Sequence, residues 1–252
     1  MPTVHLLGKV LPAVLQISIG HKPVIKWESP DSGLTMEFIN HVEQSRVDVE
    51  CRLNRYLSDD LTEIYRRALD LVRASVNLCA FAKGWGLTVY LDTFVNPDGV
   101  QSPIAPKDDR LAPLCTALAL DSEFDQVHAL VLQEVGLFMA LNDLIGAITL
   151  PHVSPVNCGR AMDGLKHLIA TPGSNDKQAW EQMREALQID EKYLKFITDH
   201  SSGPRHARPG HTPGSVTTEV TRRSWIIMNR FFEFRKRGSK RLSLPDFPLL
   251  VG

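Results

Sequence analysis

The segment "RVDVECRL" (residues 46–53) alternates strictly between apolar and charged side chains. Val47, Val49, Cys51 and Leu53 fall on one side of an extended chain, and charged residues fall on the other. A period of two predicts a strand with one buried face and one solvated face. Strands of this kind favour an antiparallel sheet, because parallel strands are usually covered on both faces.

The segments on either side of this strand extend the sheet. "LTMEF" (34–38) alternates in the same way, and the turn-like "SPDSG" (29–33) precedes it, so residues 23–40 predict a hairpin. Residues 59–83 keep helical spacing, and "GLTVYLDTF" (86–94) then returns as a strand. The first part of the chain therefore predicts a small, mostly antiparallel sheet with one long helix, which is an α+β module.

The polar, proline-containing segment "QSPIAPKDDR" (101–110) marks the best domain boundary. We therefore predict an α+β module over residues 1–105 and an all-α helical bundle over 111–252. The predicted helices run from Asp121 or Ser122 to about Ile148, and then over 160–170, 176–187, 190–200 and 218–237. Together the two parts give an α+β fold class.

The most apolar run, residues 130–150, contains Gln133, Glu134, Asn142 and Asp143. Four polar groups are costly in hydrocarbon, so we interpret this run as a buried core helix and expect no membrane span. Glu134 and Asp143 lie nine positions apart, which places them on opposite faces of a single helix. They are therefore not expected to act together as an acid and a base.

The composition is that of a packed protein, with 43% hydrophobic and 23% charged residues among 252 and a net charge of −1. Residues 205–252 carry ten Lys/Arg against three Asp/Glu. This basic end either faces a polyanion or packs on the acidic remainder of the protein itself. The four cysteines form no CxxC pair, and no secretion signal is visible, so we expect buried thiols in the cytoplasm.

The last predicted helix divides its apolar and basic side chains between two halves. Arg223, Arg230 and Arg237 repeat every seven residues and are joined by Arg222 and Lys236. We expect the three arginines of the repeat to be exposed, and Trp225, Ile227, Met228 and Phe231 to be buried. The basic half is either a solvated face of a core helix or a phosphate-binding surface, and a membrane-surface helix is a third alternative. The nucleic-acid contacts that we predict are Arg208, Arg222, Arg223, Arg230 and Arg237.

The segment "GPRHARPGH" (203–211) combines arginines and histidines with prolines and glycines. Its prolines rule out one continuous helix through this region, and the spacing of its histidines does not enforce a metal site. Histidine suits proton transfer near neutral pH, and arginine stabilises phosphoryl charge. Such a pair suffices for RNA cleavage without a metal, in which the substrate's 2′-hydroxyl attacks its own phosphate.

The motif "RHARPGH" resembles the R-x(4–6)-H signature of HEPN-type ribonucleases, and the likeness covers at most residues 115–240. The resemblance implies a metal-independent endoribonuclease or RNA-binding protein with a small helical bundle that dimerises, and no cofactor. It makes Arg205 and His211 the catalytic pair, with His206 as the polar residue that follows the arginine.

The alternative is a non-catalytic adaptor. In that case Arg205, Arg208 and the basic C-terminal helix dock an acidic partner, and the sheet module is an adaptor. Cleavage of RNA without a divalent metal separates these two hypotheses.

Overall fold

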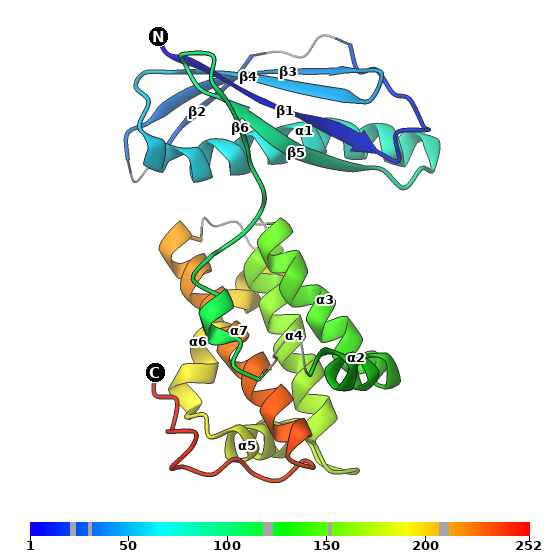
Figure 1. The fold of residues 1–252 in the computed structure, drawn as a ribbon, viewed down its shortest axis with the longest axis vertical. Coiled ribbons are helices and arrows are strands. Elements are labelled where there is room, and N and C mark those ends of the chain that lie inside the picture. Colours follow the sequence, from blue (N-terminus) through cyan, green and yellow to red (C-terminus); the bar gives the residue numbers. More distant parts are fainter. Residues whose placement is uncertain (21–23, 30–31, 118–122, 151–152, 207–211) are drawn as a thin grey trace. The chain divides into compact units, whose positions relative to one another are not determined.

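The computed structural model of the chain describes residues 1–20, 24–29, 32–117, 123–150, 153–206 and 212–252, without the side chains of 204 and 205. The chain divides into two compact units (Figure 1). Unit 1 is Met1–Ala105 and unit 2 is Pro106–Gly252. Unit 1 is a sheet with one long helix and unit 2 is helical, which confirms the predicted α+β fold class.

Unit 1 contains a six-stranded antiparallel sheet in the order β2-β3-β4-β1-β5-β6. The strands are β1 (Thr3–Leu11), β2 (Ile25–Glu28), β3 (Thr35–Glu43), β4 (Arg46–Leu53), β5 (Thr88–Val95) and β6 (Gln101–Pro103). Residues Ile25 to Glu28 pair with Phe38 to Thr35, which confirms the hairpin predicted between these segments.

The sheet is covered on one face by α1 (Leu61–Lys83) (Figure 1). The four apolar residues of β4 are buried, as their alternation predicts, and α1 buries Ile64, Ala68, Val72 and Val76 in the same core. Gly84 ends the helix in the left-handed conformation with φ of 64°, which a residue without Cβ adopts at little cost. The other face of the sheet carries mostly charged and polar side chains, including the ion pair between Lys26 and Glu37.

A bulge lies where β1 meets β5, since the pairing register shifts between Leu7 and Gly8. A Cβ atom at Gly8 would lie 1.9 Å from the carbonyl oxygen of Tyr90. Only glycine allows the two backbones to approach so closely, so this position fixes the irregular register of the two strands.

Unit 2 is built from six α-helices in the residues that the structure describes. They are α2 (Phe124–Gln133), α3 (Val135–Thr149), α4 (Ser154–Ile169), α5 (Asp176–Leu187), α6 (Glu191–Arg205) and α7 (Gly214–Lys236). The central helix is α4, which packs against α3, α5, α6 and α7. Ile227, Met228 and Phe231 of α7 are buried in the shared core, whereas Trp225 is only partly buried.

The single helix predicted from residue 121 or 122 to about Ile148 is wrong. The chain bends by 111° between α2 and α3, and Glu134 at the bend has extended φ and ψ of −117° and 95°. Gly136 follows at once, and a Cβ there would lie 3.2 Å from Leu168 of α4, so the bend brings α3 close to α4. The segment is apolar on every side, and its pattern therefore does not show where a break occurs.

Within the described residues, no single helix has the length and apolar character needed to cross a membrane. The bent pair α2–α3 meets those two criteria only when both helices are taken together.

Helix α6 extends to Arg205, beyond the predicted end at His200. Pro204 falls in the last turn, where the chain loses one backbone hydrogen bond but still continues. The backbone N–H of His206 donates to the carbonyl oxygens of Ser202 (3.2 Å) and Gly203 (3.1 Å). The arginine of the predicted catalytic motif therefore stands at a helix end.

Candidate functional site

The predicted catalytic residues lie mostly outside the part of the chain that the structure describes. Arg205 ends α6, but its side chain is not among the described atoms, and Arg208 and His211 fall in the gap at 207–211. His206 is described and exposed. The convergence of Arg205 with His206 or His211 thus stays a prediction.

His206 lines a polar groove of about 530 Å³ between α4, α5 and α6. Side chains of both signs line it, including Lys177, Arg184, Lys195, Asp163 and Glu181. Most of these charges have partners on the protein. Lys195 reaches Asp199 at 2.6 Å, and Lys177 and Arg184 lie 3.9 Å from Glu181 and Glu191.

A buried lysine holds this groove together. The ammonium of Lys166 is 2.6 Å from Asp176 and 3.3 Å from Asp163, and it lies 4.4 Å from the centroid of the Trp180 ring. Its hydrogen bond holds the pKa of the Asp176 carboxyl below the ordinary value. The groove therefore carries charges of both signs, and most of them are paired within the protein.

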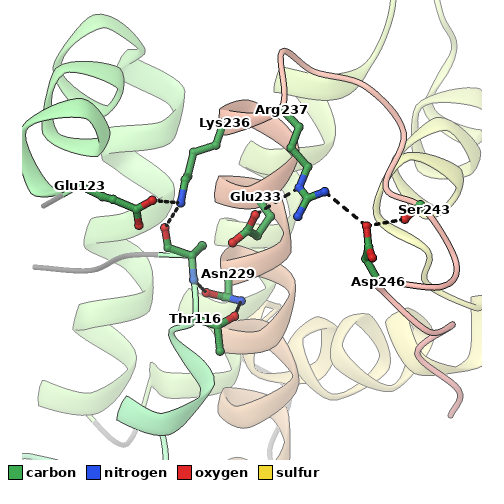
Figure 2. Close-up of polar contacts among 9 residues, drawn as sticks. Thr116, Glu123, Asn229, Glu233, Lys236, Arg237, Ser243 and Asp246 are labelled. Atoms are coloured by element: carbon green, nitrogen blue, oxygen red, sulfur yellow. Dashed lines mark hydrogen bonds and ion pairs between the residues drawn. The ribbon is translucent and has the colours of Figure 1, made fainter.

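The cations at the end of α7 bind residues of unit 2 itself (Figure 2). The ammonium of Lys236 donates to the carbonyl oxygen of Ala117 (2.8 Å) and lies 2.7 Å from Glu123. The guanidinium of Arg237 lies 3.4 Å from Glu233 and 3.5 Å from Asp246.

Arg222 and Arg223 lie nearer the start of α7. Both pair with Glu219, at 3.7 and 2.8 Å respectively. The guanidinium of Arg223 also lies over the rings of Tyr193 and Phe196, 4.6 and 4.3 Å from their centroids. Its side chain is largely covered as a result, contrary to the exposure predicted from the heptad spacing.

The predicted exposure of Arg230 is wrong. We predicted an exposed nucleic-acid contact, but the residue is 7% exposed. Its guanidinium donates to the carbonyl oxygens of Leu187 (2.9 Å), Gln188 (2.7 Å) and Pro248 (2.6 Å), and burial lowers its pKa from the ordinary value. Arg230 therefore fastens the α5–α6 turn and the C-terminal tail to α7.

The cations of the basic stripe thus have partners within unit 2, although Arg222 and Arg237 remain exposed, as predicted for Arg237. Each cation of α7 and the adjoining Arg237 has a partner in unit 2, and Arg235 pairs with Glu134 at the α2–α3 bend. These contacts show that the basic side chains bind the protein itself, whereas binding of a polyanion stays a prediction.

Metal and thiol chemistry receive little support from the described residues. They contain no group of three or more His, Cys, Asp or Glu side chains placed to hold a metal ion. All four cysteines are free, but the predicted burial holds only for Cys51 and Cys158, since Cys79 is partly exposed and Cys115 is exposed. Burial raises the pKa of Cys51 to about 12 and that of Cys158 to about 11. Such thiols are poor nucleophiles near neutral pH, because only the thiolate reacts.

Comparison with known families matches both units. Residues 4–104 match the N-terminal domain, and residues 124–236 the C-terminal domain, of a domain of unknown function, DUF8168. The chain carries both DUF8168 domains. The match to the DUF8168 C-terminal domain begins with α2 and ends with α7. No curated protein and no solved structure matches the chain.

One exposed surface of the DUF8168 C-terminal domain was not predicted from the sequence. We define the outer face of α3 as Val135, Phe138, Met139, Asn142 and Ile145. Its four apolar residues are 74%, 46%, 47% and 47% exposed, in that order. The opposite side of the same helix buries Leu137, Ala140, Leu144 and Ala147 in the core. The signal was the apolar character of residues 135–149 on every side, which we took to mean full burial.

The role of Arg230 predicts a large loss of stability in Arg230→Met. The substitution keeps much of the length of the side chain but removes the guanidinium donor from the carbonyl oxygens of Leu187 and Pro248, whereas that of Gln188 still accepts from the backbone N–H of Leu250 (3.0 Å). We expect the free energy of unfolding to fall by about 3 kcal/mol in urea titrations, and the tail after residue 238 to become sensitive to protease. The matched control is Arg222→Met, whose exposed ion pair should contribute less than about 1 kcal/mol. Equal stability of the two variants would contradict the assigned role.

The environment of Tyr193 predicts that a substitution at this position stabilises the chain. The Tyr193 hydroxyl is buried and finds no hydrogen-bond partner in the described part of the chain, and burial raises its pKa to about 12. We expect Tyr193→Phe to stabilise the chain by about 1 kcal/mol near pH 7, since an unsatisfied polar group leaves the core.

The pH dependence follows from the raised pKa of Tyr193. Below its ordinary pKa of 10.0 the hydroxyl is neutral in both states, whereas between 10.0 and about 12 the unfolded chain ionises first. The wild type therefore loses stability over this range, and Tyr193→Phe lacks that loss. Urea titrations at about pH 8 and about pH 11 measure the difference. The exposed Tyr90→Phe serves as the control, and a stability gap that stays constant between the two pH values would refute the account.

Proposed function

We propose that the chain is a non-catalytic interaction protein whose DUF8168 C-terminal domain docks a partner protein through the outer face of α3. The observation that carries this proposal is the exposure of four large apolar side chains on the outer face of a mostly apolar helix. A helix of this kind is normally covered on all sides, whereas a helix on a solvated surface is polar on its outer half.

The exposed apolar residues of α3 are also not scattered singly over the surface, because they share one side of the helix. They recur at intervals of three, four and seven residues. A run of apolar side chains at this spacing is the usual form of a helix face that another protein covers.

The proposal changes the surface that the adaptor hypothesis first invoked. That hypothesis used the basic C-terminal helix to hold an acidic partner, but Arg223, Arg230 and Lys236 are engaged within unit 2. A partner of apolar surface at α3 needs none of these cations. We also propose a reducing, cytoplasmic setting, in which the four free thiols persist.

The ribonuclease hypothesis stays a prediction. In its favour, Arg205 stands at the end of α6 and His206 borders a groove. The interaction proposal expects no cleavage of single-stranded RNA by the full chain in EDTA. Cleavage by the wild type that is lost in Arg205→Ala and in His211→Ala would replace our proposal with the ribonuclease function.

A photo-crosslinking amino acid tests the proposed docking face. We would place it at Phe138 on the outer face of α3 and, as a control, at the exposed Lys192 on α6, in cells that make the full chain. Irradiation should give a defined protein adduct from position 138 and none from 192. Ile145→Glu on the same face should remove the adduct, because it places a charge in the apolar contact.

Absence of any protein adduct at 138 would overturn the proposal, and so would adducts that contain only lipid. Adducts of equal yield and identity from 138 and 192 would show unspecific labelling and would contradict it equally.

A further inference from the structure

We propose that the occupant of the outer face of α3 is the same face of a second copy, so that the chain forms a two-fold symmetric dimer with Asn142 at the axis. The inference rests on the proposed function and names its partner. Three observations favour a second copy: the position of Asn142, the absence of charge on the face, and its area.

Asn142 occupies the centre of the outer face. At about 100° per residue, Phe138 and Ile145 lie on one side of it, and Val135 and Met139 lie on the other. Asn142 points opposite to Leu144 and Leu137, which are 1% and 0% exposed. The face therefore has one polar residue, and four apolar residues surround it.

An asparagine amide is complementary to itself, because it has both a donor and an acceptor. A two-fold axis places a residue of one copy against the same residue of the other. A single asparagine within an apolar helix face fixes the register of paired helices in this way, at a small cost in stability. A partner of different sequence would need its own donor and acceptor at this position, whereas a second copy supplies both by symmetry.

Two-fold symmetry also requires that the axis be free of charge, since each charge near it meets its own copy. The outer face of α3 contains no ionisable residue. The acidic groups at its borders have partners inside unit 2: Asp143 lies 3.4 Å from Arg160, and Glu134 pairs with Arg235. Like charges therefore do not oppose the pairing of two copies.

The area of the face matches a small but specific interface. An aromatic side chain buries roughly 150–250 Å² when fully covered and an aliphatic one less, so the five exposed residues of the outer face of α3 offer on the order of 500 Å² per copy. A pair would remove about 1,000 Å² from water, which is the lower limit for a specific protein interface. A dimer of moderate affinity follows.

A bilayer is the rival occupant, and the charges near α3 oppose it. Helices that lie on membranes carry free cations beside their apolar face, which attract anionic lipid. Here the neighbouring cations Arg160 and Arg235 are paired with carboxylates, and Asp125 adds an acidic group on α2. Lipid binding is therefore an outcome for the experiment to detect and not the arrangement that we propose.

Charged substitutions of Asn142, at the proposed two-fold axis, test the dimer. The full chain should sediment at twice its mass of 28.2 kDa, and both Asn142→Asp and Asn142→Lys should weaken self-association at least about tenfold at low salt. An equimolar mixture of the two variants should restore the dimer as a heterodimer, because opposite charges then meet. Asn142 is exposed in the single chain, so the substitutions leave the fold intact, which circular dichroism checks.

Asn77→Asp and Asn77→Lys provide the matched control, since Asn77 is an exposed asparagine within α1. Their self-association should equal that of the wild type.

Two results would overturn the inference. One is a wild type that stays monomeric at every attainable concentration, and the other is a dimer that ignores both Asn142 variants and their mixture. A monomer that still gives a protein adduct from position 138 removes the second copy but leaves the proposed function standing. A monomer that gives no adduct but binds phosphatidylglycerol vesicles removes both.

Discussion

The guanidinium of Arg230 holds the DUF8168 C-terminal domain together at the point where three separate segments meet. It joins α7 to the carbonyl oxygens of the α5–α6 turn and to that of Pro248 in the tail. Gln188 in the same turn has φ of 56° and donates through its side chain to the carbonyl oxygen of Leu242 (2.6 Å). Burying a cation costs several kcal/mol unless hydrogen bonds replace its water, and this set of carbonyls supplies them.

Because cations of α7 bind groups within unit 2, they are less available to bind another molecule. Arg230 holds the tail, and Lys236, together with Asn229, holds the segment at Thr116 and Ala117 on α7 (Figure 2). The cations that made the last helix resemble a phosphate-binding element are thus part of the internal cohesion of unit 2. In the described part of unit 2, the outer face of α3 exposes four apolar side chains and carries no charge.

The sequence allowed the α+β class to be predicted because local patterns determine it. Val47, Val49, Cys51 and Leu53 are buried on one side of β4, as a period of two requires. The burial of Arg230 was not predictable in this way. Arginines spaced seven residues apart give the same sequence pattern whether their side chains face water or bind a distant carbonyl oxygen such as that of Pro248.

The outer face of α3 was misjudged for a related reason. Hydrophobicity on every side of residues 135–149 indicates that the helix is covered, but it does not show whether the cover belongs to the same chain. The bend at Glu134 was hidden by the same uniformity. The convergence of Arg205 with His206 or His211 stays a prediction, because the side chain of Arg205 and all of His211 lie outside the described part of the chain.

The most direct measurement of the central claim is a disulfide across the proposed axis. Asn142→Cys is made in the full chain with Cys79 and Cys115, the cysteines that are not buried, changed to serine. Two-fold pairing brings the new thiols of the two copies within bonding range, so mild oxidation should link most of the chains into a covalent dimer. If Asn142→Cys links no better than Asn77→Cys in the same background, the outer face of α3 does not pair with itself and the account is wrong.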